Sequence, residues 1–444
     1  MSVFRVGSNK SSVNNFPSVR PTLDLDFANS KTLDPRITFT RASGGSYVGA
    51  DGLIKYAGVN EARFDHNPVT GESLGLLIEE SRTNLVTYSD AITNSNLYSV
   101  VVATLTQVTT TTPISGLAIA TKVFLNIGAN AGNSINGFNF GVFSLTNSTV
   151  YTQSIFVKAS GSSVFRLRSN VTGQVFDIPI AGPAPTLTGT ITSCTVTPYP
   201  DGWSRISWTF TSTTSIPGNR GDHWVMKPNI ADGSSGFLVT GAQLEAGAFA
   251  TSYIPTEGST RTRAADNASI TGKNFSDWYN HGEGTLAATA SIRGANTVVS
   301  TGLAIINGIA KLAETALSAN SRVIIFNAGA SPNRYTAAQR SAVSIIALND
   351  NTYETIQFGK YYNLTMSYVN NSTQGLALSV DGRTVLTNAT AVDVPVSTRL
   401  LIGAGNYGSN PGQNADDYYL NGTIKRLTYY PKRLPNAQLQ ALTK

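Results

Sequence analysis

The sequence has a single cysteine, Cys194, and only three histidines in 444 residues. One cysteine cannot form an intramolecular disulfide, which excludes a small secreted domain stapled by disulfides. Three scattered histidines and one cysteine also cannot make a transition-metal site from local spacing. The chemistry of this chain must therefore rest on other residue types.

Charge is scarce as well. Asp, Glu, Lys and Arg make up 13% of the residues, against about 25% in a typical globular protein. The net charge of +6 comes from short clusters such as Lys425-Arg426 and not from a basic stripe, so nucleic-acid binding is not expected. The longest apolar runs, such as residues 323–326, are too short to span a membrane, and residues 1–10 lack the apolar core of a signal peptide.

Hydrophobic residues make up 41% of the chain, and much of the polar remainder is Ser, Thr, Asn and Gly. Thr suits the pleated surface of a strand, while Asn and Gly suit turns. Apolar and polar residues alternate at 23–27, 165–168 and 376–380, and Asp51-Gly52 separates two short apolar stretches as a hairpin turn does. These patterns predict an all-β protein of antiparallel strands, with one late helix over residues 435–442.

The patterns divide the chain into four parts. Residues 1–20 have no periodic apolar pattern and are predicted to be a flexible or attachment arm. Residues 21–82 are dense in strand and hairpin signals and predict an N-terminal β module. Residues 83–266 and residues 267–444 each predict an antiparallel β-sandwich.

One short self-similarity stands out. Thr40-Arg41-Ala42-Ser43 resembles Thr262-Arg263-Ala264-Ala265, and the second copy lies at the end of the part predicted over residues 83–266. We predict that both are seams between domains, where an arginine anchors a chain crossing.

Two motifs match enzyme fingerprints but lack the context that the chemistry needs. Residues 403–408 match a dinucleotide-binding loop, yet residues 409–412 (Ser-Asn-Pro-Gly) cannot open the helix that must follow. Residues 71–75 match a nucleophile elbow but are followed by a short apolar strand, so a hairpin turn is expected. Glu79 and Glu80 are adjacent and would point to opposite faces of a strand. No catalytic residue is therefore predicted, and the chain is expected not to be an enzyme. The sequence leaves open the alternative of a hydrolytic site built from residues far apart in the chain.

Aromatic side chains in turn-rich surroundings are the candidates for binding sugar, because a ring face stacks on the apolar face of a pyranose. These candidates are Tyr407, Tyr418, Tyr419 and Trp203. Trp208 and Trp224 lie in strand patterns and are expected in a core. Asp416 and Asp417, beside Asn414, are a weak candidate for a Ca²⁺ site because they offer hard oxygen ligands. Otherwise no cofactor is expected.

Several segments also carry a resemblance to known families. Residues 21–27, 34–43, 62–66 and 75–84 together resemble a module near the N-terminus of phage and prophage structural proteins. Residues 201–205 and 241–255 resemble a carbohydrate-binding-module-like jelly roll. Residues 379–382, 400–403 and 421–431 resemble concanavalin A-like sandwiches of the laminin G type. The paired-glutamate strand of the glucanase members has no counterpart here.

The resemblance implies a virion protein, assembled in the host cytoplasm and exposed on the released particle. It implies a tail fibre or adhesin that attaches to other virion proteins through its N-terminal region and contacts host-surface polysaccharide through its sandwiches. A homo-oligomer, in such fibres commonly a trimer, is a further implication. The alternatives are a capsid decoration or head-fibre protein with a mainly structural role and, less favoured, a polysaccharide depolymerase.

Overall fold

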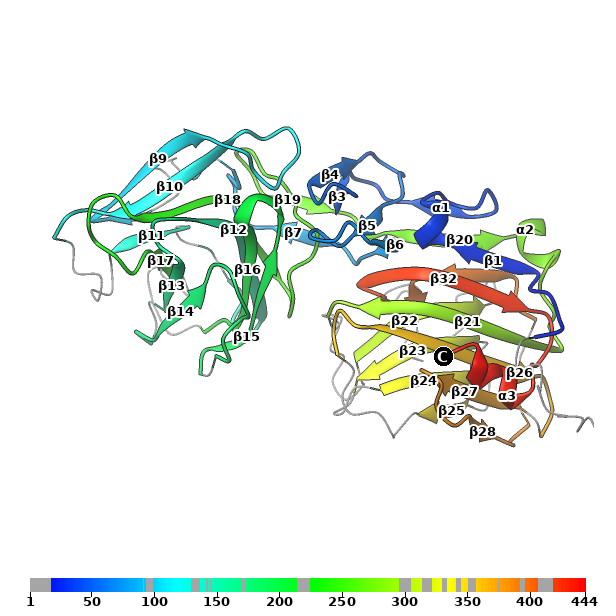
Figure 1. Ribbon diagram of the computed structural model, residues 1–444. Helices are drawn as coiled ribbons and strands as arrows, with labels where there is room; N and C mark the ends of the chain where they lie inside the picture. The colour runs from blue at the N-terminus through cyan, green and yellow to red at the C-terminus, as the bar shows by residue number, and fades with distance from the viewer. Residues whose placement is uncertain are drawn as a thin grey trace, which may run out of the picture.

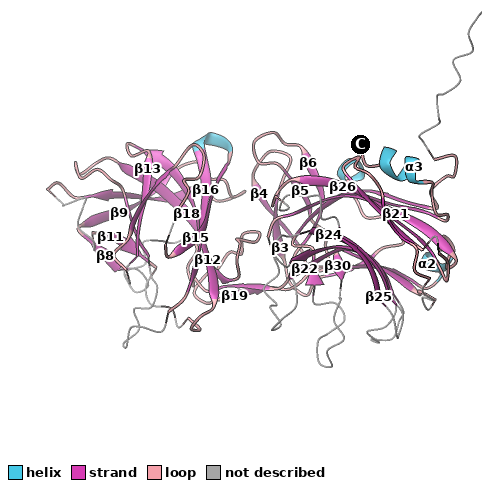
Figure 2. Ribbon diagram, turned by 90° about the horizontal axis from the view of Figure 1, so that it is seen from below, coloured by secondary structure: helices cyan, strands magenta, loops and turns pink. Residues whose placement is uncertain are grey.

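The computed structural model contains two β-sandwiches that lie side by side, with a smaller hairpin region between them (Figures 1 and 2). It describes residues 17–90, 92, 99–128, 136–140, 143, 145–169, 172–187, 189–213, 224–294, 305–313, 322–329, 334–340, 345–349, 357–373, 375–391, 396–405 and 418–444. The strands in the sheets pair antiparallel, which confirms the predicted all-β fold class.

The middle sandwich is built from residues between 99 and 246. One sheet has the order β15 (Ile191–Pro198), β16 (Trp203–Thr211), β12 (Val150–Ser160), β18 (Gly236–Ala246), β10 (Ile119–Leu125) and β9 (Ala103–Thr109). The other has the order β14 (Val175–Pro179), β13 (Val164–Ser169), β17 (Trp224–Lys227), β11 (Gly137–Asn139) and β8 (Ser99–Val101). A 3₁₀ turn, η1 (Pro200–Gly202), precedes β16.

Aromatic rings from both sheets fill the core between them. Phe165 and Leu167 of β13 are buried, as their alternation with Arg166 predicts. The ring of Phe165 lies 6.0 Å from that of Trp208 on the facing sheet. Trp208 and Trp224 are both buried, which confirms the prediction that they belong to a core.

The C-terminal sandwich takes strands from both ends of the chain. One sheet has the order β28 (Leu386–Asn388), β27 (Leu376–Val380), β26 (Tyr361–Val369), β21 (Glu283–Ile292), β32 (Gly422–Tyr430), β6 (Ser73–Ile78) and β5 (Phe64–His66), and β1 (Leu23–Asp26) also pairs with β32. The other has the order β2 (Thr38–Thr40), β20 (Asn267–Thr271), β29 (Arg399–Ile402), β22 (Ile305–Ala313), β23 (Arg322–Gly329), β24 (Arg334–Arg340) and β25 (Ile345–Asn349).

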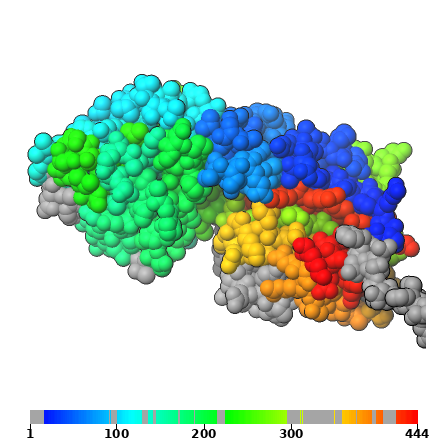
Figure 3. Space-filling model, in the orientation of Figure 1, coloured from blue at the N-terminus to red at the C-terminus, as the bar shows by residue number. Residues whose placement is uncertain are grey.

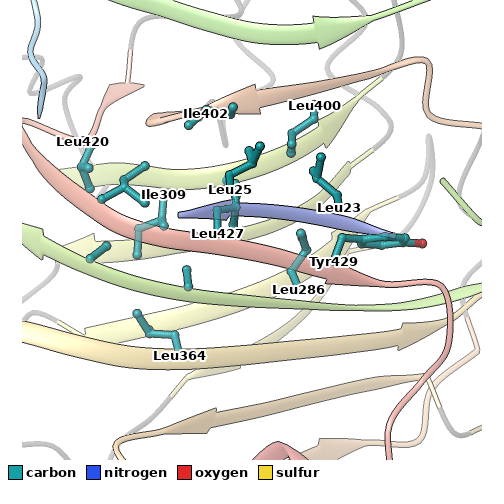
Figure 4. Packing of buried hydrophobic residues seen from close by; sticks show 14 of the residues in the cluster. Leu23, Leu25, Leu286, Ile309, Leu364, Leu400, Ile402, Leu420, Leu427 and Tyr429 are labelled. Carbon is teal, nitrogen blue, oxygen red and sulfur yellow. The ribbon is translucent and has the colours of Figure 1, made fainter. Parts of the chain in front are cut away.

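Residues 21–82, which the sequence predicts as a module of their own, are thus distributed over both sheets of the C-terminal sandwich. Leu23 pairs with Tyr429 and Leu25 with Leu427, and all four side chains are buried in one core (Figure 4). The alternating pattern of a strand indicates that one of its faces is buried, but it does not indicate which strand pairs with it. Here the partner of β1 lies some four hundred residues further along the chain.

The remaining elements are short. They are the hairpin of β3 (Gly45–Val48) and β4 (Ile54–Ala57), the pair of β7 (Arg82–Asn84) and β19 (Arg261–Arg263), the pair of β30 (Ala404–Gly405) and β31 (Tyr418–Tyr419), and the helices α1 (Phe27–Ser30), α2 (Lys273–Ser276) and α3 (Asn436–Ala441). The hairpin at Asp51-Gly52, the turn over residues 71–75 and the late helix are as predicted. Within the described residues, no helix is long and apolar enough to cross a membrane.

The β3–β4 hairpin packs on the middle sandwich. The Ile54 amide donates to the Pro113 carbonyl at 2.7 Å, and the Ser115 amide donates to the Ile54 carbonyl at 2.9 Å. An apolar cluster joins the two parts: Val48, Ile54, Ile114, Ala120, Phe156, Tyr199, Trp203, Leu238 and Tyr253. Residues 45–57 therefore bridge the two sandwiches, and Figure 3 shows the blue N-terminal segment between them.

We predict that a fragment of residues 267–444 does not fold cooperatively. It lacks β1, β2, β5 and β6, so β32 and β20 lose partners and the core loses Leu23 and Leu25. Deleting even one buried Leu side chain costs about 2–5 kcal/mol. Thermal unfolding followed by circular dichroism checks this prediction.

The matched control is a chain in which a short Gly-Ser linker joins Asn84 to Arg261, which are paired neighbours in β7 and β19. This chain keeps every described strand of the C-terminal sandwich and is expected to melt cooperatively. A fragment of 267–444 that melts as sharply as this control would contradict the prediction.

Candidate functional site

The aromatic residues predicted to contact sugar are not gathered in one place by the described part of the chain. Trp203 is 1% exposed, and its indole Nε1 donates to the Thr111 carbonyl at 2.9 Å. Its ring lies in the apolar cluster under the β3–β4 hairpin, beside Val48 and Ile54. This position corrects the prediction for Trp203, because a ring covered on both sides has no face for a sugar. The covering hairpin is some 150 residues away in sequence, so local pattern could not indicate it.

Tyr419 is half-buried against the core of the C-terminal sandwich, and its hydroxyl donates to Asn267 Oδ1 at 3.2 Å. The backbone of Tyr418 pairs with Gly405. The side chain of Tyr418, together with Tyr407, Asp416 and Asp417, lies outside the described residues. Among the residues that the structure describes, no group of His, Cys, Asp and Glu side chains could hold a metal ion.

A buried ionic cluster lies where the two sandwiches meet, and we call it the seam network. It consists of Arg41, Arg63 and Arg263 with Glu79 and Asp266, and each of these side chains is at most 1% exposed. Arg41 Nη1 lies 3.0 Å from Asp266 Oδ1, and Arg63 Nη1 lies 2.8 Å from Glu79 Oε2. Arg63 Nη2 also donates to Asp266 Oδ2. The cluster joins segments more than 180 residues apart in sequence, since Arg63 and Asp266 are separated by 203 positions.

Backbone groups and Ser252 add further hydrogen bonds to the network. Arg41 Nη2 donates to the Gly58 carbonyl at 2.7 Å, and Arg263 Nη2 donates to the Glu80 carbonyl at 2.6 Å. Ser252, at the end of the middle sandwich, donates its amide and its hydroxyl to Glu79 at 2.8 and 2.7 Å. The sequence predicts separate seams at Arg41 and at Arg263, whereas the structure brings both arginines into one network where the two sandwiches meet.

The electrostatics of Glu79 follow from this arrangement. Burial alone raises the pKa of Glu79, because a charged carboxylate is poorly solvated away from water. The guanidinium groups of Arg263, Arg63 and Arg293 outweigh burial and hold the pKa of Glu79 well below its ordinary value. Glu79 is thus a carboxylate at neutral pH, as three neighbouring arginines require.

A pocket of about 410 Å³ opens beside the seam network, and we call it the seam pocket. Its lining comes from β3, β4, β19 and the segment after β18: Gly44, Gly45, Ser46, Tyr56, Ala57, Tyr253, Ile254, Pro255, Arg261, Thr262 and Arg263. At Gly45 a Cβ atom would lie 3.1 Å from Arg41 Nε, so bare backbone covers the network there. The pocket is therefore walled by elements that the buried ion pairs hold in place.

Three side chains give the seam pocket its chemistry. Tyr56 on β4 is 46% exposed and presents a ring to solvent. The hydroxyl of buried Tyr253 lies 2.7 Å from Asp90 Oδ1 and 2.5 Å from Ser89 Oγ. Arg261, exposed on β19, supplies a cation. Burial and the charge of Asp90 raise the pKa of Tyr56, while Arg261 acts to lower it, so the Tyr56 hydroxyl remains a donor at neutral pH.

The lining also limits what the seam pocket can do. None of its lining residues is a carboxylate, a histidine or a cysteine. The lining therefore offers no pair of groups for general acid–base catalysis and no activated nucleophile of the common kinds. Aromatic rings, hydroxyl groups, backbone amides and one exposed guanidinium instead suit the binding of a polar ligand with an apolar face.

No pattern in the sequence marks Tyr56 or Arg261 as a binding residue. The Thr262-Arg263 repeat marked the neighbourhood of Arg261, and the hairpin at Asp51-Gly52 placed Tyr56 on a strand. No local signal brings β4 and β19 together, because they are about two hundred residues apart and meet only through the folded seam.

No family model matches this chain, and no curated protein matches it. It is similar to the CBM40 domain of Ruminococcus gnavus IT-sialidase bound to α2,3-sialyllactose, with 15% identity over 36% of this chain and 83% of that chain and a TM-score of 0.29. It is also similar to the CBM22-1–CBM22-2 tandem domain of Paenibacillus barcinonensis Xyn10C, with 7% identity over 81% and 99% of the two chains and a TM-score of 0.24. Its structural neighbours thus include carbohydrate-binding modules, while the resemblance to phage structural proteins stays a prediction.

We predict that Glu79→Gln destabilises the protein by about 3–5 kcal/mol, because it leaves three buried arginines with one carboxylate. Urea unfolding followed by tryptophan fluorescence measures the loss, since Trp203 lies near the seam. Glu257→Gln is the control, because Glu257 is exposed and the change removes the same charge. Its expected effect is within about 0.5 kcal/mol. Equal unfolding midpoints for the two variants would show that the network contributes no net stability.

The same carboxylate predicts an acid dependence. The pKa of Glu79 is depressed in the folded protein relative to about 4.3 in the unfolded chain, so its stabilising contribution is complete well above that value and is lost as pH falls through and below it. We expect the contribution of Glu79 to decline as pH falls below about 5, so that stability declines less steeply in Glu79→Gln. Urea titrations of both proteins across this range check the difference. Parallel curves would contradict the assignment to Glu79.

Proposed function

We propose that this protein is a non-enzymatic structural and binding component of a bacteriophage particle, of the tail-fibre type, and that it contacts a saccharide of the host surface in the seam pocket. The observation that carries the binding half is the seam pocket itself. Its volume falls within the range of about 300–1,000 Å³ typical of small-ligand sites.

The side chains of the pocket suit a sugar. A pyranose has one apolar C–H face and a rim of hydroxyl groups. The partly exposed ring of Tyr56 offers a stacking surface, and apolar Ala57, Ile254 and Pro255 lie beside it. The exposed guanidinium of Arg261 offers hydrogen-bond donors at the same place.

Rigidity of the site also supports a binding role. A site binds more tightly when its groups are held in position before the ligand arrives. Arg263 lines the pocket and is held in the seam network, and Tyr253 lines it with its hydroxyl held by Ser89 and Asp90. The pocket therefore needs little ordering on binding.

The virion half of the proposal rests on the four N-terminal segments that resemble phage structural proteins. Three of them contain the seam residues: 34–43 includes Arg41, 62–66 includes Arg63, and 75–84 includes Glu79. The first, 21–27, forms β1 and the start of α1. The four segments contribute to the C-terminal sandwich and to the seam network, and we propose that this part of the chain faces the other virion proteins. Antibody-labelled electron microscopy of the particle tests this half. Label on the capsid would indicate a head-fibre protein. Absence of label from the particle would contradict the virion half of the proposal.

We predict that Tyr56→Ala abolishes glycan binding by the full chain, because it removes the stacking surface of the seam pocket. A host-polysaccharide pull-down and a glycan array check this outcome. Phe358→Ala is the matched control: Phe358 is 47% exposed against 46% for Tyr56, but it does not line the pocket. Unchanged binding in Tyr56→Ala, or equal loss in both variants, would place the sugar elsewhere.

A further inference from the structure

We infer that the seam pocket selects a saccharide that carries a carboxylate, and that Arg261 is the residue that recognises it. This inference rests on the proposed function, because it names the class of glycan for the same site. It begins from the orientation of β19. Arg261 and Arg263 are two residues apart on one strand, so their side chains leave the same face. Arg263 enters the seam network, and Arg261 extends from that face at the rim of the pocket.

The arginines in and beside the seam differ in their partners. Arg41, Arg63 and Arg263 are paired within the network, Arg82 with Glu80, and Arg293 with Asp65. In the described part of the chain, Arg261 has no ion pair and no side-chain hydrogen bond. Its guanidinium therefore keeps its fork of donors for a ligand, and such a fork matches a carboxylate with two parallel hydrogen bonds.

The charges around the pocket favour an anion. The lining carries Arg261 and Arg263 and no carboxylate. Beneath it, the seam network has three arginines and two carboxylates, so it retains a positive charge. The carboxyl group of Asp90 lies behind the lining, where it accepts hydrogen bonds from Tyr253 and Thr240.

The geometry also explains why the anion should belong to a sugar. A free anion would use Arg261 alone and leave the apolar wall of the pocket wet. A saccharide with a carboxylate, such as a uronic or sialic acid unit, places its ring against Tyr56 while its carboxylate reaches Arg261. Tyr56 and Arg261 both line this one pocket. One sugar unit of the glycan then makes two contacts, ring stacking on Tyr56 and a charged hydrogen bond to Arg261.

The test uses the full chain on an array in which each uronic- or sialic-acid glycan is paired with its carboxyl-reduced counterpart. We expect the acidic member to bind at least about tenfold more tightly, because a hydrogen bond to a charged group contributes about 1.5–3 kcal/mol. Arg261→Gln should remove this preference, so that the acidic and the reduced member of each pair bind with equal affinity. Arg261→Lys should keep part of it.

Two further variants separate the outcomes. Arg20→Gln, which removes an exposed charge away from the pocket, should keep the preference. Tyr56→Ala should lose binding to both the acidic and the reduced member of each pair. Equal affinity for acidic and reduced glycans would overturn this inference and leave the proposed function standing, as would equal affinity for sulfated glycans in place of carboxylated ones. No binding to any glycan would overturn both.

Discussion

Three arginine and two acidic side chains are buried together at the seam, and the arrangement of both sandwiches depends on their pairing. Moving each charge out of water costs several kcal/mol, and only close pairing and full hydrogen bonding compensate for it. Arg41, Arg63 and Arg263 reach their carboxylate partners only when segments around residues 41, 63, 79, 252 and 266 are all in place, and even then Nε of Arg63 and Nε of Arg263 have no hydrogen-bond partner among the residues that the structure describes. The network therefore forms only when these distant segments adopt one specific arrangement. Apolar contacts alone would specify that arrangement less strictly.

This demand explains the path of the chain. The N-terminal strands join the sheets of the C-terminal sandwich, the chain then leaves to form the middle sandwich, and it returns through β19 beside β7. The exit and the return are adjacent, and both carry seam residues. The seam pocket is a result of this arrangement, because its walls come from the hairpin before the exit and from the strand at the return.

Much of the fold followed from local pattern. The hairpin at Asp51-Gly52, the strand around Phe165 and Leu167 and the late helix depend on neighbours in sequence, and the structure has them. The short repeat around Arg41 and Arg263 even located the seam. Less of the candidate site could be predicted from the sequence. Trp203 looked like a surface ring because a turn precedes it, whereas a distant hairpin covers it. Tyr56 and Arg261 looked ordinary because neither has a local partner.

The sequence by itself determined the strand class, the turns and the short repeat around two seam arginines, since alternation, turn chemistry and short repeats are properties of neighbouring residues. Only the tertiary structure decided which strands pair, which aromatic rings are covered and where a pocket opens. β1 and β32 are paired although almost the whole chain separates them. The physical reason is that burial of an apolar face or a charge specifies that a partner must exist, while the identity of the partner depends on every segment that competes for the same place.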